Sequence, residues 1–253
     1  MAEQGILVDV YSLAAIRNIV AFDAEDGNVV AAANSLLKVV DGNQIGDSDD
    51  DTGLLVTGNA TAFIGGSNTL SAEYGALDCE FAGVIMQEGE GPNEMMTVNG
   101  RTSAVENCFI FIGNADLNGN IEMQQNSSMT LEAEEDGSSV TVTGDVRMSQ
   151  QSSLLVDDEG TVNIGGGLVF LLNSSITVRS GTLTSSLQLH ASSRAEFLTD
   201  VVTPTGTNVI ELHSFSTLQS SQSNPVTETE VICFGDNAAF FNDGVVPIND
   251  LCD

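Results

Sequence analysis

The chain has no tryptophan, two tyrosines and one lysine among its 253 residues. The scarcity of large aromatic residues leaves few side chains on which sugar rings could stack. No apolar run approaches the ~18 residues that a membrane-spanning helix needs, so we predict no membrane insertion. The first residues, MAEQG, include neither a basic nor an apolar targeting region, so no signal peptide is visible; either the chain is not secreted or its numbering begins after processing.

Positive charge is also scarce, because six Lys and Arg residues stand against 36 Asp and Glu residues, for a net charge of −30. Such a surface repels phosphate backbones and predicts no nucleic-acid partner. It attracts cations and suits a salty exterior, where ions screen its self-repulsion. A hydrophobic fraction of 42% nevertheless predicts a folded core.

A pattern repeated five times occupies the second half of the chain. Each copy begins with an apolar residue, at Ile121, Val146, Leu168, Leu187 and Ile210. A second apolar residue follows two positions later, at Met123, Met148, Phe170, Leu189 and Leu212. A serine follows six positions after the first residue, at Ser127, Ser152, Ser174, Ser193 and Ser216. Polar residues separate the apolar ones, and this alternation is the period of a β-strand.

The copies begin 25, 22, 19 and 23 residues apart, although the offsets inside each copy stay constant. This predicts two short strands around a fixed bend at the serine, with a third strand in the variable remainder. Such short strands bury their apolar faces only by stacking on the next copy, as in a solenoid. The serines should then form one axial column with a spacing of about 4.8 Å.

In this pattern, residues 50–232 resemble the right-handed parallel β-helix proteins of the broad pectate-lyase-like class. The resemblance implies an all-β solenoid, here with about 19–25 residues per coil. Left-handed hexapeptide solenoids keep a strict coil length, which these drifting copies fit poorly. An all-β sandwich is the alternative fold, but it gives no reason for the constant offset to serine.

Three segments follow from this interpretation. Residues 1–45 are predicted to be an N-terminal cap made of helix or strand, because "SLAAIRNIVAF" and "NVVAAANSLLKVV" have helix-like spacing. Residues 46–232 are the β-helix, and residues 233–253 are a C-terminal cap. An apolar first cap and an aromatic second cap predict a head-to-tail contact, which salt or calcium should strengthen.

The four cysteines show no metal-binding spacing and predict two disulfides, with four buried thiols as the alternative. Cys79 and Cys108 lie about one coil apart and are expected to pair, while Cys233 and Cys252 would close the C-terminal cap. Three glycosylation sequons begin at Asn59, Asn126 and Asn173.

The acidic run "GDSDDDTG" is a candidate calcium site, because Asp47, Asp49 and Asp51 have the 1-3-5 spacing of an EF-hand loop. The later positions of that loop do not match, so a solvated acidic loop is the competing interpretation.

His190 and His213 each lie three residues into their copies, which places them in neighbouring coils. They could share a metal or titrate as a pair, and two independent surface histidines are the competing interpretation.

Enzymes of the resembled class use a lysine or arginine base beside calcium-binding acids, or a GHG-centred histidine. Here Lys38 lies outside the predicted coils and no GHG occurs. We therefore expect no catalytic residues and no required cofactor, with calcium as the candidate ligand.

The predicted function is a non-enzymatic structural or adhesive solenoid of an extracellular matrix, coat or filament. We expect it at a cell or virion surface, with copies of itself as partner. The alternative is a β-helix that binds or cleaves polysaccharide, as a lyase, a glycosidase or a tailspike-type viral fibre.

Overall fold

The computed structural model describes residues 6–8, 12–17, 29–40, 43–46, 52–87, 95–133, 138–158, 161–198, 201–202, 209–221, 231–235, 237–242 and 246–247. These residues form strands, turns and bends, and none of their segments forms a helix that could span a membrane.

The strands form three long sheets, and each sheet takes every third strand of the repeating part of the chain. Sheet A contains β1 (Ile6–Val8), β3 (Val29–Ala31), β6 (Thr52–Thr57), β9 (Gly75–Glu80), β12 (Thr102–Val105), β15 (Ile121–Met123), β18 (Val146–Ser149), β21 (Leu168–Leu172), β24 (Ser186–His190), β27 (Ile210–His213) and β29 (Val231–Phe234). Sheet B contains β2 (Leu13–Arg17), β4 (Leu36–Val40), β7 (Thr61–Gly65), β10 (Gly83–Gln87), β13 (Phe109–Ile112), β16 (Ser128–Ala133), β19 (Ser153–Asp158), β22 (Ser175–Val178), β25 (Arg194–Phe197), β28 (Thr217–Ser220), β30 (Ala239–Asn242) and β31 (Val246–Pro247). Sheet C contains β5 (Gln44–Ile45), β8 (Thr69–Ser71), β11 (Met96–Asn99), β14 (Ala115–Leu117), β17 (Ser139–Val142), β20 (Thr161–Ile164), β23 (Gly181–Leu183) and β26 (Val201–Val202).

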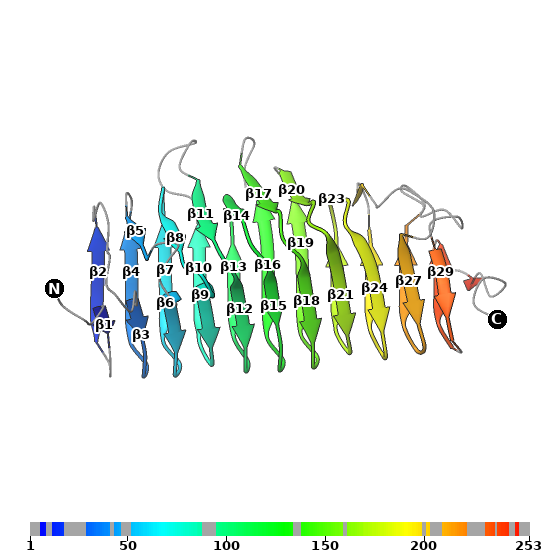
Figure 1. The fold of residues 1–253 in the computed structure, drawn as a ribbon, viewed down its shortest axis with the longest axis horizontal. Helices are drawn as coiled ribbons and strands as arrows, with labels where there is room; N and C mark the ends of the chain where they lie inside the picture. The colour runs from blue at the N-terminus through cyan, green and yellow to red at the C-terminus, as the bar shows by residue number, and fades with distance from the viewer. Residues whose placement is uncertain are drawn as a thin grey trace.

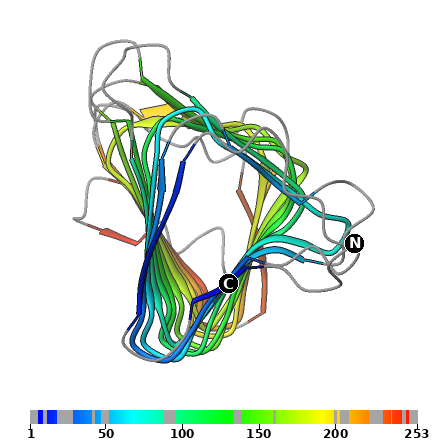
Figure 2. The same ribbon diagram turned by 90° about the vertical axis from the view of Figure 1, so that its left-hand side faces the viewer.

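Successive coils stack along the long axis of the molecule (Figure 1), and the three sheets surround one core when viewed down that axis (Figure 2). The eight strands of sheet C mark eight complete three-stranded coils. Pairing between coils is parallel throughout the described residues, and only β30 and β31 pair antiparallel. The chain is thus an all-β parallel β-solenoid, as the resemblance to right-handed parallel β-helix proteins implies.

In its described residues the N-terminal segment forms strands, although the sequence predicted helix or strand there. β2 and β4 pair in parallel over five residues, and β3, β4 and β5 pair with the three strands of the next coil. The helix-like spacing is therefore misleading, because alternation continues locally: Leu37 and Val39 are buried, whereas Leu36 and Lys38 are exposed.

The serine column exists as predicted. Ser127, Ser152, Ser174, Ser193 and Ser216 are all buried, and the residue after each pairs with its counterpart in the next coil. The apolar residue two positions after each serine is also buried. Small residues continue the column through the first half of the chain, at Ser35, Ala60, Ala82 and Cys108.

The bend before this column is built from residues with positive φ. Asn126 has a φ of 60° and Asn173 a φ of 51°, in the left-handed region that asparagine tolerates better than most residues. There the amide of Asn126 donates to the carbonyl of Gln150 in the next coil, at 2.9 Å. The inter-coil ladder therefore continues around the corner and leaves these backbone groups satisfied.

A different corner, between sheets C and A, contains the glycine column Gly100, Gly119, Gly144 and Gly166. A Cβ on any of the last three would overlap the carbonyl oxygen of the preceding glycine in the column. Neighbouring coils approach so closely here that only glycine fits.

One copy of the repeat has a different register from the one that the sequence suggested. Val146 pairs with Val169, so the copy begins at Val169 and not at Leu168. Its bend is one residue shorter, because Asn173 stands where the preceding coil has Gln150 and Gln151. The later start and the shorter bend cancel, so Ser174 still lies at its predicted position. Between them, Phe170 points outward and Leu171 fills the core.

Candidate functional site

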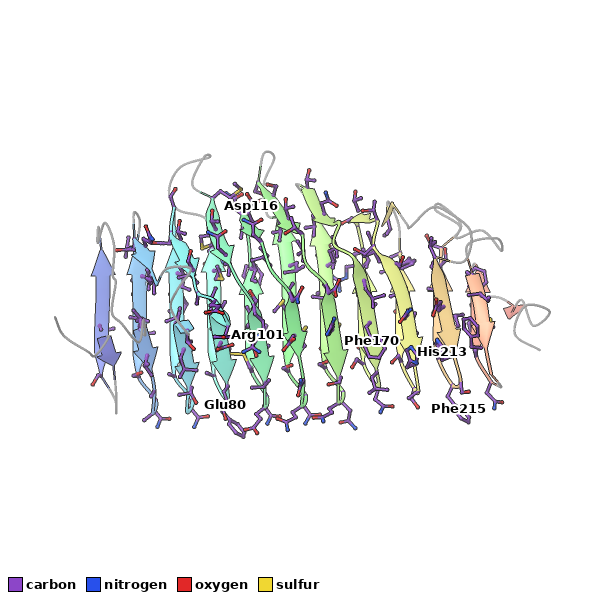
Figure 3. All side chains as sticks on the ribbon, in the orientation of Figure 1. Glu80, Arg101, Asp116, Phe170, His213 and Phe215 are labelled. Carbon is purple, nitrogen blue, oxygen red and sulfur yellow. A yellow bond between two sulfur atoms is a disulfide. The ribbon has the colours of Figure 1, made fainter. Side chains whose placement is uncertain are left out.

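Four aromatic rings lie in a row on the outer face of sheet A. The ring centroids of Phe170 and His190 are 4.9 Å apart, those of His190 and His213 are 3.7 Å apart, and those of His213 and Phe234 are 5.0 Å apart. The row runs from β21 to β29 along the solenoid axis (Figure 3, where Phe170 and His213 are labelled). The sequence correctly places the two histidines in neighbouring coils. It does not reveal Phe170, because the register shift is visible only in the strand pairing.

The histidine pair is arranged as a stack. Its interplanar angle is 16°, so the nitrogen lone pairs lie in two nearly parallel planes and do not converge on one ion. Burial lowers the pKa of His190, and the neighbouring His213 lowers it further, while Glu211 opposes the shift. His213 Nε2 lies 3.5 Å from Glu211 Oε2 without hydrogen-bond geometry. Burial and the stacked neighbour therefore favour the uncharged form of the His190 imidazole.

Beside this row lies a groove of about 250 Å³. Its lining combines charge, amide and apolar groups: Glu122, Gln124, Arg147, Met148, Ser149 and Phe170. Glu122 and Arg147 are register neighbours on β15 and β18, so opposite charges face the groove from adjacent coils. The groove and the aromatic row together offer hydrogen-bonding groups next to flat rings.

Further toward the N-terminus, Arg101 links two coils on the same face (Figure 3). Its guanidinium lies 3.4 Å from Asp78 Oδ1 and 3.5 Å from Glu122 Oε2. Burial raises the pKa of Asp78, whereas Arg101 lowers it. A Cβ on Gly75 would overlap the Asp78 carboxylate, so the absence of a side chain there leaves room for this ion pair.

Amide side chains gather at the bend between sheets A and B. They line a shallow hollow of about 700 Å³, formed by Gln125, Asn126, Gln150, Gln151, Asn173 and Ser192.

All three sequon asparagines, Asn59, Asn126 and Asn173, occupy positive-φ positions at this bend. The small residue after each belongs to the buried column, and the hydroxyl residue starts the next strand. The geometry of the bend therefore accounts for the sequon pattern, and glycosylation remains a prediction.

The disulfide between Cys79 and Cys108 joins neighbouring coils with a Cα–Cα distance of 5.9 Å. Cys79 belongs to an inward position of sheet A, and Cys108 replaces serine in the bend column. Cys233 is also disulfide-bonded, and its predicted partner Cys252 lies outside the described residues.

The calcium candidate residues Asp47, Asp49 and Asp51 also lie outside the described residues. Within the part of the chain that the structure describes, no three His, Cys, Asp or Glu side chains cluster as a metal site would require.

Comparison of the chain with protein-family models, with curated proteins and with solved structures finds no match.

Proposed function

We propose that this protein is a non-enzymatic structural or adhesive β-solenoid of an extracellular matrix, coat or filament, and that it associates with copies of itself. The observation that carries this proposal is the continuity of the solenoid. Eight complete coils follow one another in register, and three parallel sheets extend along one core. Such an array resists bending because each complete coil pairs with its neighbours along all three sheets.

The corners support the same conclusion. Backbone hydrogen bonds continue through the bend before the serine column, and a disulfide joins two coils there. The eleven strands of sheet A, at about 4.8 Å each, make a rod roughly 50 Å long. Disulfides and an acidic surface suit an oxidising, salty exterior.

Light scattering across a salt and calcium titration tests this function. With −30 charges on each chain, association should strengthen as salt shortens the screening length, and calcium should strengthen it further by bridging carboxylates. Electron microscopy of the same samples should reveal assemblies. A constant monomer mass at every salt, calcium and protein concentration contradicts the proposal.

A second candidate function, carbohydrate binding, is favoured by the aromatic row and its adjoining groove. Phe170 contributes to both, so Phe170→Ala should weaken binding of a polysaccharide panel at least tenfold if sugars stack there. Phe81→Ala, which changes an exposed phenylalanine at the bend between sheets A and B, is the matched control. Equal binding by both variants contradicts a sugar site in this groove.

A further inference from the structure

Two outward columns of sheet B carry no carboxylate over seven consecutive coils, whereas the outward column beside them contains Glu132 and Asp157. We define the B face as the two outward columns from β4 to β22, which contain Leu36, Lys38, Thr61, Phe63, Gly83, Ile85, Phe109, Phe111, Ser128, Thr130, Ser153, Leu155, Ser175 and Thr177. None of the chain's 36 Asp and Glu residues occurs there. The outer face of sheet A, by contrast, carries Asp78, Glu80, Glu122 and Glu211.

The B face is also divided along the rod. Its N-terminal half carries large apolar groups, and Phe63 and Phe109 remain 39% and 41% exposed. Its C-terminal half carries mostly serine and threonine, with Leu155 as the single large apolar residue. If two such sheets face each other in antiparallel orientation, the bulky half of each sheet lies against the small half of the other.

We propose that the B face binds the B face of a second copy of this chain, with the two rods antiparallel. This inference rests on the proposed function, because it names the surface through which the rods associate side by side. The two-fold axis of this pair lies parallel to the strands, between β13 and β16. Each outward column of one copy therefore faces the same column of the second copy, with the order of the residues reversed. This contact is distinct from an end-to-end contact between caps.

Steric complementarity follows from this register. Phe63 faces Thr177 of the second copy, Ile85 faces Leu155, and Phe111 faces Thr130, as the alignment of the columns requires. In two of these pairs an aromatic ring meets a smaller side chain, which lets the faces interdigitate.

Charge complementarity follows as well. The next residue in the column after Thr177 is Glu196, and it faces Lys38 of the second copy at both ends of the contact. At the edge of the face, Glu132 is placed opposite Gly113 and Asp157 opposite Gln87. No carboxylate therefore faces another across the contact, which would be costly between chains of net charge −30.

The size of the face predicts a weak contact. From β4 to β25 the contact covers eight coils, about 38 Å, and a five-residue strand is about 16 Å long, so each copy contributes roughly 600 Å². A pair then buries about 1,200 Å², near the lower limit for a specific interface. We expect dimers at high protein concentration, favoured by salt.

A charge inserted at the two-fold axis tests the face. Thr130→Glu places two carboxylates opposite Phe111 and close to each other, and it should raise the dissociation constant at least tenfold in sedimentation velocity. Thr141→Glu is the matched control, because Thr141 is an outward threonine of similar burial on sheet C.

Disulfide trapping tests the register. In the variant Phe63→Cys/Thr177→Cys, the new thiols lie five coils apart in one chain, about 24 Å, so mild oxidation joins them only between chains. Glu122→Cys/Glu211→Cys on sheet A is the control. The expected result is that only Phe63→Cys/Thr177→Cys cross-links and only Thr130→Glu associates more weakly.

Two outcomes contradict the B-face contact but leave the proposed function standing. In the first, wild type associates while Thr130→Glu and Thr141→Glu behave alike. In the second, only Glu122→Cys/Glu211→Cys cross-links. If wild type stays monomeric at every salt and calcium concentration, both fail.

Discussion

Sheets A and B have similar inward residues and different outward ones. Their inner columns are buried and mostly apolar in both sheets, and Thr102 and Ser220 are polar members. Outside, sheet A carries carboxylates, an arginine network and the aromatic row, whereas the B face carries apolar and hydroxyl groups. The inner columns specify the coil, so differences in function must come from the outer columns.

The largest expected effect tests whether the two sheets share one core. Leu189→Ala in sheet A and Leu131→Ala in sheet B each remove a fully buried side chain, and each should lower the free energy of unfolding by about 2–5 kcal/mol. Leu155→Ala on the B face should cost less than about 1 kcal/mol. Guanidinium denaturation measures all three. Similar losses at inner and outer positions would contradict the division between them.

The second prediction concerns the disulfide that joins sheet A of one coil to the bend column of the next coil. Cys79→Val/Cys108→Ser removes the disulfide but restores residue types found elsewhere in both columns, since Val56 precedes Cys79 and serine fills the bend. The crosslink spans 29 residues, so its loss should cost roughly 3–4 kcal/mol by releasing chain entropy in the unfolded state. A loss below about 1 kcal/mol in the same denaturation experiment would show that coil stacking alone fixes this region.

The smallest expected effect is the pH response of sheet A. The pKa of His190 is lowered in the folded protein, so the unfolded chain binds the proton more readily. Stability should therefore decline as pH falls below about 6.5, the ordinary histidine value, and level off below the lower folded pKa. Compared with wild type, His190→Gln should show a smaller loss between pH 7 and pH 5. Identical pH profiles would mean that protonation of His190 does not change the stability of the protein.

Much of the fold can be predicted from the sequence because strand alternation and the serine offset are local patterns. The pattern places Ser127, Ser152 and their counterparts correctly, since a small residue is required wherever the bend repeats. The coils of the first half are not visible as copies of the same pattern, because alanine and cysteine replace serine at Ala60, Ala82 and Cys108.

The outer surface is harder to predict. The repeat pattern assigns Phe170 to the core, which is wrong because two one-residue shifts cancel at the next serine. The B face is hidden in the sequence for a related reason. Its columns unite residues about 20 positions apart, and their shared lack of carboxylates appears only when the strands are aligned.

The central claim is that the rods associate side by side through the B face. Small-angle X-ray scattering at high protein concentration and high salt measures both the length and the cross-section of the assembly. We expect the length of wild type to stay near that of one rod, about 50 Å, while the cross-section increases, and we expect Thr130→Glu to retain the cross-section of a monomer. An assembly with twice the length and an unchanged cross-section, formed equally by wild type and Thr130→Glu, would contradict the claim and place the contact at the ends of the solenoid.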